Sequence, residues 1–298
     1  MKKISMIALS VIMTVGAVSF AEEVKREELK LEKWSSGFSF YPEGNEKIKM
    51  FYWFHEHFIL KAVYNKNWKP AGKGGPLSIS DDGKTAKSNK RKDGMQLEVT
   101  SKDGAIDMLL TVTNQSKYEW PEVAAIIPCL SPNLIRRKSK DEPKVIMNGK
   151  GENFDSTTFE TPNMVNNNTF VVIDDKLQQL KLRELHYCDS YREKIDTELN
   201  GKVLKKNWPV NEANFSKGVM IRESTDGVYV VAVAWEDAIS VQGHNPYCCM
   251  HLSIRVGGLK PGESKTVRGK MYLFKGKKED SMKLLDKDFE YWKANPVK

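Results

Sequence analysis

The sequence predicts a mostly β protein, a large antiparallel two-sheet β-sandwich with a C-terminal helix. Two observations carry this prediction. Short apolar or alternating runs recur along the chain between turn signals, which is typical of sandwiches and barrels. Near the C-terminus, Met282, Leu285, Phe289 and Trp292 recur at spacings of three, four and three, so they share one face of a helix.

The N-terminus has the composition of an export signal. Lys2 and Lys3 precede an apolar run from Ile4 to Phe20, and Ser19 and Ala21 provide the small residues that a signal peptidase accepts. We therefore expect residues 1–21 to be a cleaved signal peptide and the protein to be secreted or periplasmic. An uncleaved membrane anchor is the alternative, although the run is short for a bilayer span.

Length and composition favour one domain after this segment. The chain has 298 residues, of which 40% are hydrophobic, enough for a sizeable core. Residues 22–33 form a charged N-terminal segment that fits a short helix or a tether. No repeat or composition break divides residues 34–298, which we expect to be a single β-sandwich domain.

Charge argues against a nucleic-acid partner. The net charge of +8 includes the two lysines of residues 1–21, which leaves +6 on the mature chain. The densest basic run, Lys84–Lys92, contains no aromatic residue and is interpreted as a solvated loop. Charged residues interrupt every later apolar run, so we expect no membrane span in the mature chain.

The first half of the domain is predicted to consist of strands. Turn signals such as Gly74-Gly75-Pro76 and Asp103-Gly104 separate them. The predicted strands are Gly37–Tyr41, Ile48–His57 with Phe58–Tyr64, Leu77–Ser80, Met95–Thr100, Ile106–Asn114 and Glu122–Leu130.

The middle of the chain is less regular. Four runs each fit a further strand, although Leu177–His186 also fits a helix. The polar segment Asp189–Asn214 is predicted to cross the surface and to form a pocket wall. The four runs are Val145–Met147, Thr169–Asp174, Leu177–Leu182 and Glu184–Cys188.

Two hairpins are predicted in the C-terminal third. Val219–Glu223 and Val228–Trp235 flank the turn Thr225-Asp226-Gly227. His251–Val256 and Thr266–Phe274 flank Leu259-Lys260-Pro261-Gly262-Glu263, which favours a second hairpin.

The stretch Gln242–Gly258 is the main candidate site. Strict alternation places Met250, Leu252, Ile254 and Val256 on one face of a strand and turns Cys249, His251, Ser253 and Arg255 to the other. The predicted hairpin would bring Arg268, Lys270 and Tyr272 to the same polar face. Such a surface suits an anionic or polyhydroxylated ligand, but it is also what the solvated face of an antiparallel sheet shows.

Specific roles follow from the side-chain chemistry. His251 or His244 is the predicted general acid or base, and Arg255 and Arg268 would orient the ligand. The further predicted ligand-binding residues are Tyr272, Trp53 and His186.

A divalent metal is a second hypothesis. In an extended strand, His55 and His57 share a face and can both ligate one ion. A third ligand would come from His186, His244, Glu184 or Glu223. The alternative is that these histidines pack among the aromatic residues that precede them.

Cysteine usage leaves the pairing open. Cys248 and Cys249 are adjacent and point to opposite faces of a strand, so a bridge between them would distort the chain. Cys129 with Cys188, or either of these with Cys248 or Cys249, is geometrically easier, and a free buried thiol is a further possibility. The oligomeric state is also left open.

Other chemistries lack their motifs. The sequence contains no Gly-x-Ser-x-Gly elbow, and strand alternation separates Cys248 from His251, so a Cys–His dyad is not indicated. Phosphate-loop and dinucleotide fingerprints are absent as well.

Three stretches carry a resemblance: Thr111–Cys129, Gln242–Arg255 and Leu259–Gly276. Together they resemble an uncharacterised group of secreted bacterial proteins. A strand ending in Val-Thr-Asn-x-Ser and a late strand introduced by Leu-x-Pro-Gly-Glu-Ser are also similar to galactose-mutarotase-like proteins. That resemblance implies a two-sheet sandwich with a concave, sugar-facing surface. The catalytic His and Glu of mutarotases match no particular position here, so their activity is not implied.

The sequence thus favours a secreted protein that binds or modifies a carbohydrate in a cleft lined by His and Arg. A non-catalytic binding or interaction module of the cell envelope is one alternative. A metal-dependent secreted enzyme is another.

Overall fold

The computed structural model describes residues 24–34, 37–58, 77–88, 94–131, 135–136, 145–146, 168–181, 184–198, 209–224, 226–243 and 249–297. Residues 55–58, 135–136, 145–146, 196 and 198 are described by their backbone alone. The predicted signal peptide, His244 and Cys248 lie outside the described residues, as do the side chains of His55 and His57.

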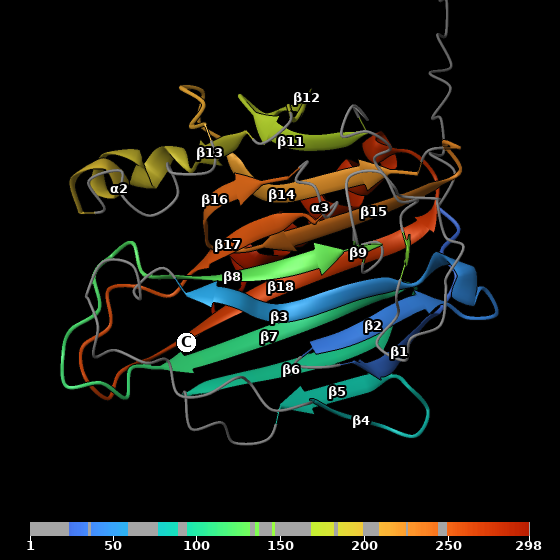
Figure 1. The fold of residues 1–298 in the computed structure, drawn as a ribbon, viewed down its shortest axis with the longest axis horizontal. Helices are drawn as coiled ribbons and strands as arrows, with labels where there is room; N and C mark the ends of the chain where they lie inside the picture. The colour runs from blue at the N-terminus through green and yellow to red at the C-terminus, as the bar shows by residue number, and fades with distance from the viewer. Residues whose placement is uncertain are drawn as a thin grey trace, which may run out of the picture.

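Two antiparallel sheets form the fold (Figure 1), as predicted. The first, called the seven-stranded sheet, has the order β1-β2-β3-β8-β17-β16-β13 within the described residues. Its strands are β1 (Leu29–Trp34), β2 (Gly37–Pro42), β3 (Met50–Phe58), β8 (Ala125–Ser131), β13 (Leu185–Tyr187), β16 (Ala238–Gln242) and β17 (His251–Arg255).

The second, called the nine-stranded sheet, has the order β12-β11-β14-β15-β18-β7-β6-β5-β4 in the described part of the chain. Its strands are β4 (Leu77–Ile79), β5 (Thr85–Ser88), β6 (Met95–Lys102), β7 (Ala105–Thr113), β11 (Thr169–Ile173), β12 (Lys176–Gln179), β14 (Lys217–Glu223), β15 (Tyr229–Trp235) and β18 (Ser264–Lys275). A separate short pair is formed by β9 (Ile135–Arg136) and β10 (Val145–Ile146).

The main core lies between the two sheets. Strand β6 shows why: its residues alternate strictly between buried and exposed, so Met95, Leu97 and Val99 point inward. They join a cluster that includes Tyr52 of β3 and Trp235 of β15. Burying one apolar face of each sheet against the other is the principal driving force for this architecture.

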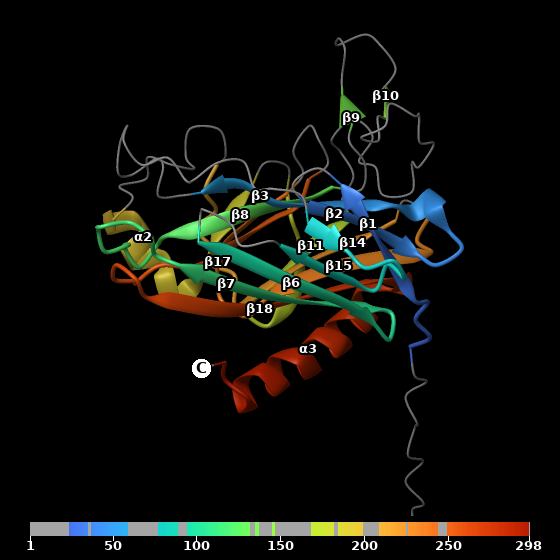
Figure 2. The ribbon, with the colours of Figure 1, turned by 90° about the horizontal axis from the view of Figure 1, so that it is seen from below.

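The C-terminal helix covers the outer face of the nine-stranded sheet. Helix α3 (Lys278–Ala294) lies beneath this sheet, on the side away from the seven-stranded sheet (Figure 2). Leu285 and Trp292 are buried against Ile221 and Ala232 of the strands above. The predicted apolar stripe is confirmed: Met282 and Phe289 pack against the same cluster.

The outer face of the seven-stranded sheet carries a smaller cluster. Ala125 and Ile127 of β8 and Tyr187 of β13 pack there with Ile195. Ile195 belongs to α2 (Arg192–Glu198), which follows the 3-10 turn η3 (Asp189–Tyr191). A second turn, η1 (Glu46–Ile48), precedes β3.

One predicted hairpin is confirmed and the other is wrong. Strands β14 and β15 pair directly, as expected. Strands β17 and β18 do not: β17 pairs with β8 and β16, whereas β18 pairs with β7 and β15. The chain between them therefore crosses from one sheet to the other, and Arg268, Lys270 and Tyr272 do not join the face of His251.

The structure also corrects three smaller predictions made from the sequence. Leu177–His186 forms parts of β12 and β13 and no helix in its described residues. Residues 29–34 form strand β1, where the sequence allowed a helix or tether, and Leu29 and Leu31 enter the core. The basic run Lys84–Lys92 includes strand β5, so its first half is not a loop.

Candidate functional site

Strand β17 divides its side chains as the alternation predicts. Leu252 and Ile254 are in the core between the sheets. His251 and Ser253 face outward from the seven-stranded sheet but are nearly inaccessible, with 8% and 0% of their surface exposed. The Ser253 hydroxyl shares a 2.7 Å hydrogen bond with that of Ser240 on β16, so it is used within the sheet.

Two cysteines lie beside His251. Cys249 precedes it on the same face, and Cys129 comes from the neighbouring strand β8. One ligand atom from each residue lies within 4.8 Å of the others. Among the described cysteines Cys129, Cys188 and Cys249, no disulfide bond is present.

Arg255 lies at the opposite end of β17 from His251. Its guanidinium bonds both the carboxylate of Glu122 and, at 3.1 Å, that of Asp237. The guanidinium carbon also lies 4.7 Å from the ring centre of Tyr191. Burial alone would lower the pKa of Arg255, but Asp237 and its other partners raise it, so the cation is firmly held.

Asp237 connects Arg255 to Lys265, whose ammonium lies 2.6 Å from the same carboxylate. Burial lowers the pKa of Lys265 in spite of this pairing. Burial and the nearby charge of Asp237 raise the pKa of Tyr191 to about 12, so its phenol keeps its proton at neutral pH.

Tyr191, Asp237 and Lys265 border a groove at the end of the sandwich, called the end groove, with a volume of about 530 Å³, whereas Arg255 is not part of its lining. It lies where the chain crosses from β15 to β16 and therefore from one sheet to the other. Helix α3 and the residues after it, Pro296 and Val297, close one side. Its polar and aromatic lining includes Tyr191, Lys217, Glu236, Asp237, Lys265 and Phe289.

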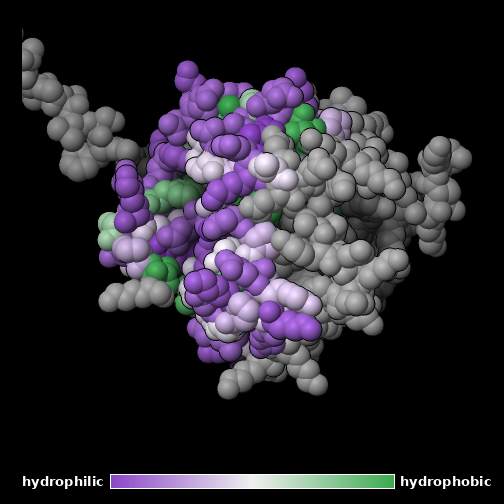
Figure 3. Space-filling model, turned by 90° about the vertical axis from the view of Figure 1, so that its left-hand side faces the viewer, coloured by the Kyte–Doolittle hydropathy of each residue, from purple (hydrophilic) through white to green (hydrophobic). Residues whose placement is uncertain are grey.

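Charged side chains that line the groove form ion pairs with neighbouring residues of opposite charge. Lys217 lies 2.7 Å from Asp286 of α3. Glu236 is bound by Arg268, with 2.8 Å between Nε and Oε2. The side of the molecule that carries α2 is mostly hydrophilic over its described residues, with small hydrophobic patches (Figure 3).

Arg268 and Tyr272, predicted to bind ligand, instead hold α3 in place. Arg268 donates to the backbone oxygens of Trp292 and Asn295, at 2.7 and 2.6 Å. Tyr272 donates to Asp288 at 2.7 Å. Through Glu236, Arg268 still contributes to the wall of the end groove.

Among the predicted residues whose side chains are described, His186, Trp53 and His251 do not converge on one cleft. His186 is 2% exposed; its Nδ1 lies 2.9 Å from the Ala213 oxygen and its Nε2 lies 3.1 Å from Glu184. Trp53 is half-buried and packs edge-on against Trp34, with ring centres 6.3 Å apart. His251 is not among the residues that line the end groove.

Tyr191 lies in Asp189–Asn214, the segment predicted to form a pocket wall. Two other groove residues, Lys217 and Lys265, gave no signal in the sequence, and only folding brings them to the groove. Glu236 and Asp237 were detectable as a pair of acids directly after the apolar run Val228–Trp235, where a strand ends.

The described residues contain no helix long and apolar enough to cross a membrane. No family model matches the sequence, and no curated protein matches it.

Solved structures do resemble the chain, at low identity. A candidate aldose 1-epimerase from Escherichia coli K12 is 11% identical, with a TM-score of 0.39, and the match covers 83% of this chain and 100% of that one. A candidate mutarotase from Salmonella typhimurium is 9% identical, with a TM-score of 0.37 over 84% and 89%. A galactose mutarotase related enzyme from Lactobacillus acidophilus is 12% identical, with a TM-score of 0.34 over 86% and 97%. Likenesses at this level carry no argument about function, so the function of this chain has to be argued from its own residues.

Proposed function

We propose that the protein binds a carbohydrate in the end groove. The observation that carries the proposal is the composition of this groove, which combines the aromatic side chains Tyr191 and Phe289 with the acids Glu236 and Asp237. Aromatic rings pack on the apolar faces of sugar rings, and carboxylates accept hydrogen bonds from hydroxyls. The volume is within the range of about 300–1,000 Å³ typical of small-molecule sites.

The ion pairs of the groove favour binding over catalysis. Asp237 is held by Arg255 and Lys265, and Glu236 by Arg268. Charges fixed in this way present rigid hydrogen-bond acceptors to a ligand, at little cost in side-chain entropy on binding. The proposal is therefore a binding protein, exported by residues 1–21.

Binding can be tested with the purified protein on a glycan array, followed by calorimetry on any glycan retained. Tyr191→Ala and Phe289→Ala should each weaken binding at least about tenfold, equivalent to about 1.4 kcal/mol. Tyr291→Ala is the matched control, because this side chain of α3 is 62% exposed and does not line the groove.

Two outcomes would remove the proposal. One is the absence of any retained glycan. The other is binding that survives both groove variants but is lost in His251→Ala, which would move the ligand to the outer face of β17.

A further inference from the structure

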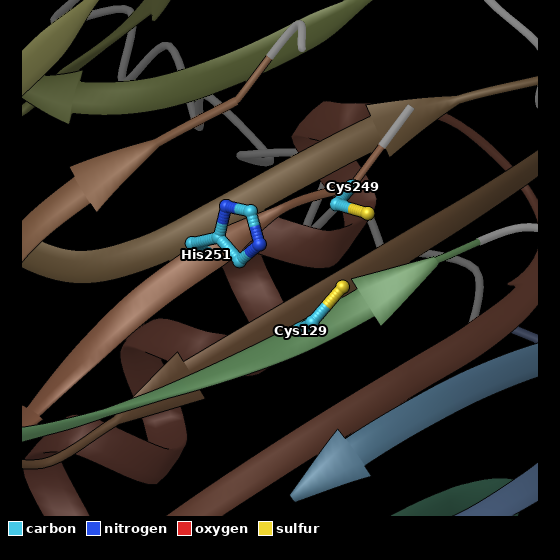
Figure 4. A group of neighbouring side chains, drawn as sticks. All are labelled: Cys129, Cys249 and His251. Atoms are coloured by element: carbon cyan, nitrogen blue, oxygen red, sulfur yellow. The ribbon is translucent and has the colours of Figure 1, made fainter. Parts of the chain in front are cut away.

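We propose that Cys129, Cys249 and His251 bind a thiophilic divalent metal ion, Zn²⁺. This site is independent of the end groove and of the proposed carbohydrate function. The sulfur atom of Cys129 points toward Cys249, and the imidazole of His251 lies beside the two cysteines (Figure 4). One ligand atom from each residue lies within 4.8 Å of the others, so a single ion can contact all three after small side-chain rotations.

Backbone register explains why these residues meet. Leu130 of β8 and Met250 exchange both backbone hydrogen bonds, at 3.0 and 2.8 Å. The next residues along, Cys129 and His251, are therefore directly opposite in a non-hydrogen-bonded pair, the type in which side chains approach most closely. Cys249 is two residues before His251 and so shares its face.

The sheet is also irregular at this point, on both sides of β8. Strand β17 pairs with β8 at Ala125 and Ile126 and again at Leu130, while Pro128, which has no N–H to donate, lies between. Regular central strands rarely contain proline.

On the other side, β3 bulges. Trp53 is opposite Cys129 and His57 is opposite Ile127, so four positions of β3 span two positions of β8. Bulges change the direction of side chains and are frequent beside functional sites. Both irregularities are next to Cys129.

The ligand chemistry favours zinc. Two thiolates and one imidazole match its preference for sulfur and nitrogen donors, whereas Ca²⁺ and Mg²⁺ prefer oxygen. All three residues are buried, with exposures of 5%, 9% and 8% for Cys129, Cys249 and His251. Sites with three protein ligands typically keep a fourth position for water or a substrate.

The first test measures metal in the purified, reduced wild-type protein by mass spectrometry, after equilibration with Zn²⁺ and removal of loosely bound ions. We expect one zinc per chain. Replacement by Co²⁺ should give the visible bands of a tetrahedral ion and a thiolate-to-cobalt charge-transfer band. This wild-type readout does not depend on whether any variant folds.

Variants then locate the ion. Cys129→Ser, Cys249→Ser and His251→Ala should each weaken zinc binding by more than about 100-fold, since loss of an outer-shell partner alone typically costs about 10–100-fold. Cys188→Ser is the matched control and should retain the ion, because Cys188 is a described cysteine outside the cluster. Circular dichroism checks that each variant is folded.

Three results would overturn the proposal. The first is substoichiometric zinc in wild type with no cobalt–thiolate band. The second is a disulfide between Cys129 and Cys249 found by peptide mapping of the unreduced protein. The third is zinc that is lost in His55→Ala and His57→Ala but retained in Cys249→Ser, which would place the metal on β3.

Discussion

At the scale of single residues, His186 and Glu184 show how a predicted site residue is used by the fold. Buried His186 connects β13 to the segment before β14 through Ala213. Burial alone would raise the pKa of Glu184, but hydrogen bonds from Asn211, His186 and the backbone of Lys181 outweigh it and lower the pKa overall.

The lowered pKa of Glu184 predicts a pH-dependent contribution to stability. A carboxylate with a depressed folded pKa stabilises the protein above its unfolded pKa of about 4.3, and this contribution is lost as the pH falls through the folded value. Glu184→Gln should therefore be less stable than wild type near pH 7, and the difference should shrink below about pH 4.

Urea unfolding between pH 7 and pH 3 measures this difference. Glu193→Gln on α2 is the control, because Glu193 is exposed. A stability difference for Glu184→Gln that stays constant over this range would contradict the prediction.

At the scale of elements, helix α3 is the clearest agreement between sequence and structure. Its apolar stripe is buried on the nine-stranded sheet, and Arg268 and Tyr272 fix it with hydrogen bonds. The same two residues were predicted to bind a ligand. Their chemistry was identified correctly as donors on a polar face, but that face is the outer face of the nine-stranded sheet.

Truncating the stripe should destabilise the whole domain. Leu285 is fully buried, so Leu285→Ala should lower the free energy of unfolding by about 2–5 kcal/mol. Tyr291→Ala, on the exposed side of the helix, should change it by no more than about 0.5 kcal/mol. Thermal or urea unfolding compares the two, and equal losses would mean that α3 does not pack as described.

At the scale of the whole molecule, a hydrogen bond between two large buried side chains joins the two sheets. The indole N–H of Trp235 on β15 donates to the hydroxyl of Tyr52 on β3, at 3.2 Å. Both side chains are fully buried, and burial raises the pKa of Tyr52, so its phenol stays neutral. This pair therefore links the two sheets within the core that they share.

Removing the Tyr52 hydroxyl should lower the free energy of unfolding by more than the loss of its small volume alone would. Tyr52→Phe leaves the Trp235 N–H buried without an acceptor, which typically costs about 1–3 kcal/mol. Tyr118→Phe should be nearly neutral, because Tyr118 is 63% exposed. Chemical unfolding tests the pair, and a Tyr52→Phe protein as stable as wild type would show that the bond contributes nothing.

The sequence by itself determined most of the strands, the two faces of β17 and the closing helix, because these depend on local alternation and turn residues, but it did not predict β1, β5 or β16. It also separated Cys249 and His251 from the apolar face of β17. These features repeat every two residues or every turn of helix, so a single stretch of chain contains all the information needed.

Only the tertiary structure decided which strands are neighbours. Leu252 and Ile254 of β17 and Val267 and Met271 of β18 all enter the same core. Two apolar faces joined by a turn give the same sequence pattern whether they are side by side in one sheet or face to face across the core. Here they are face to face, which removes Arg268 and Tyr272 from the predicted site and brings Cys129 of β8 to His251 instead.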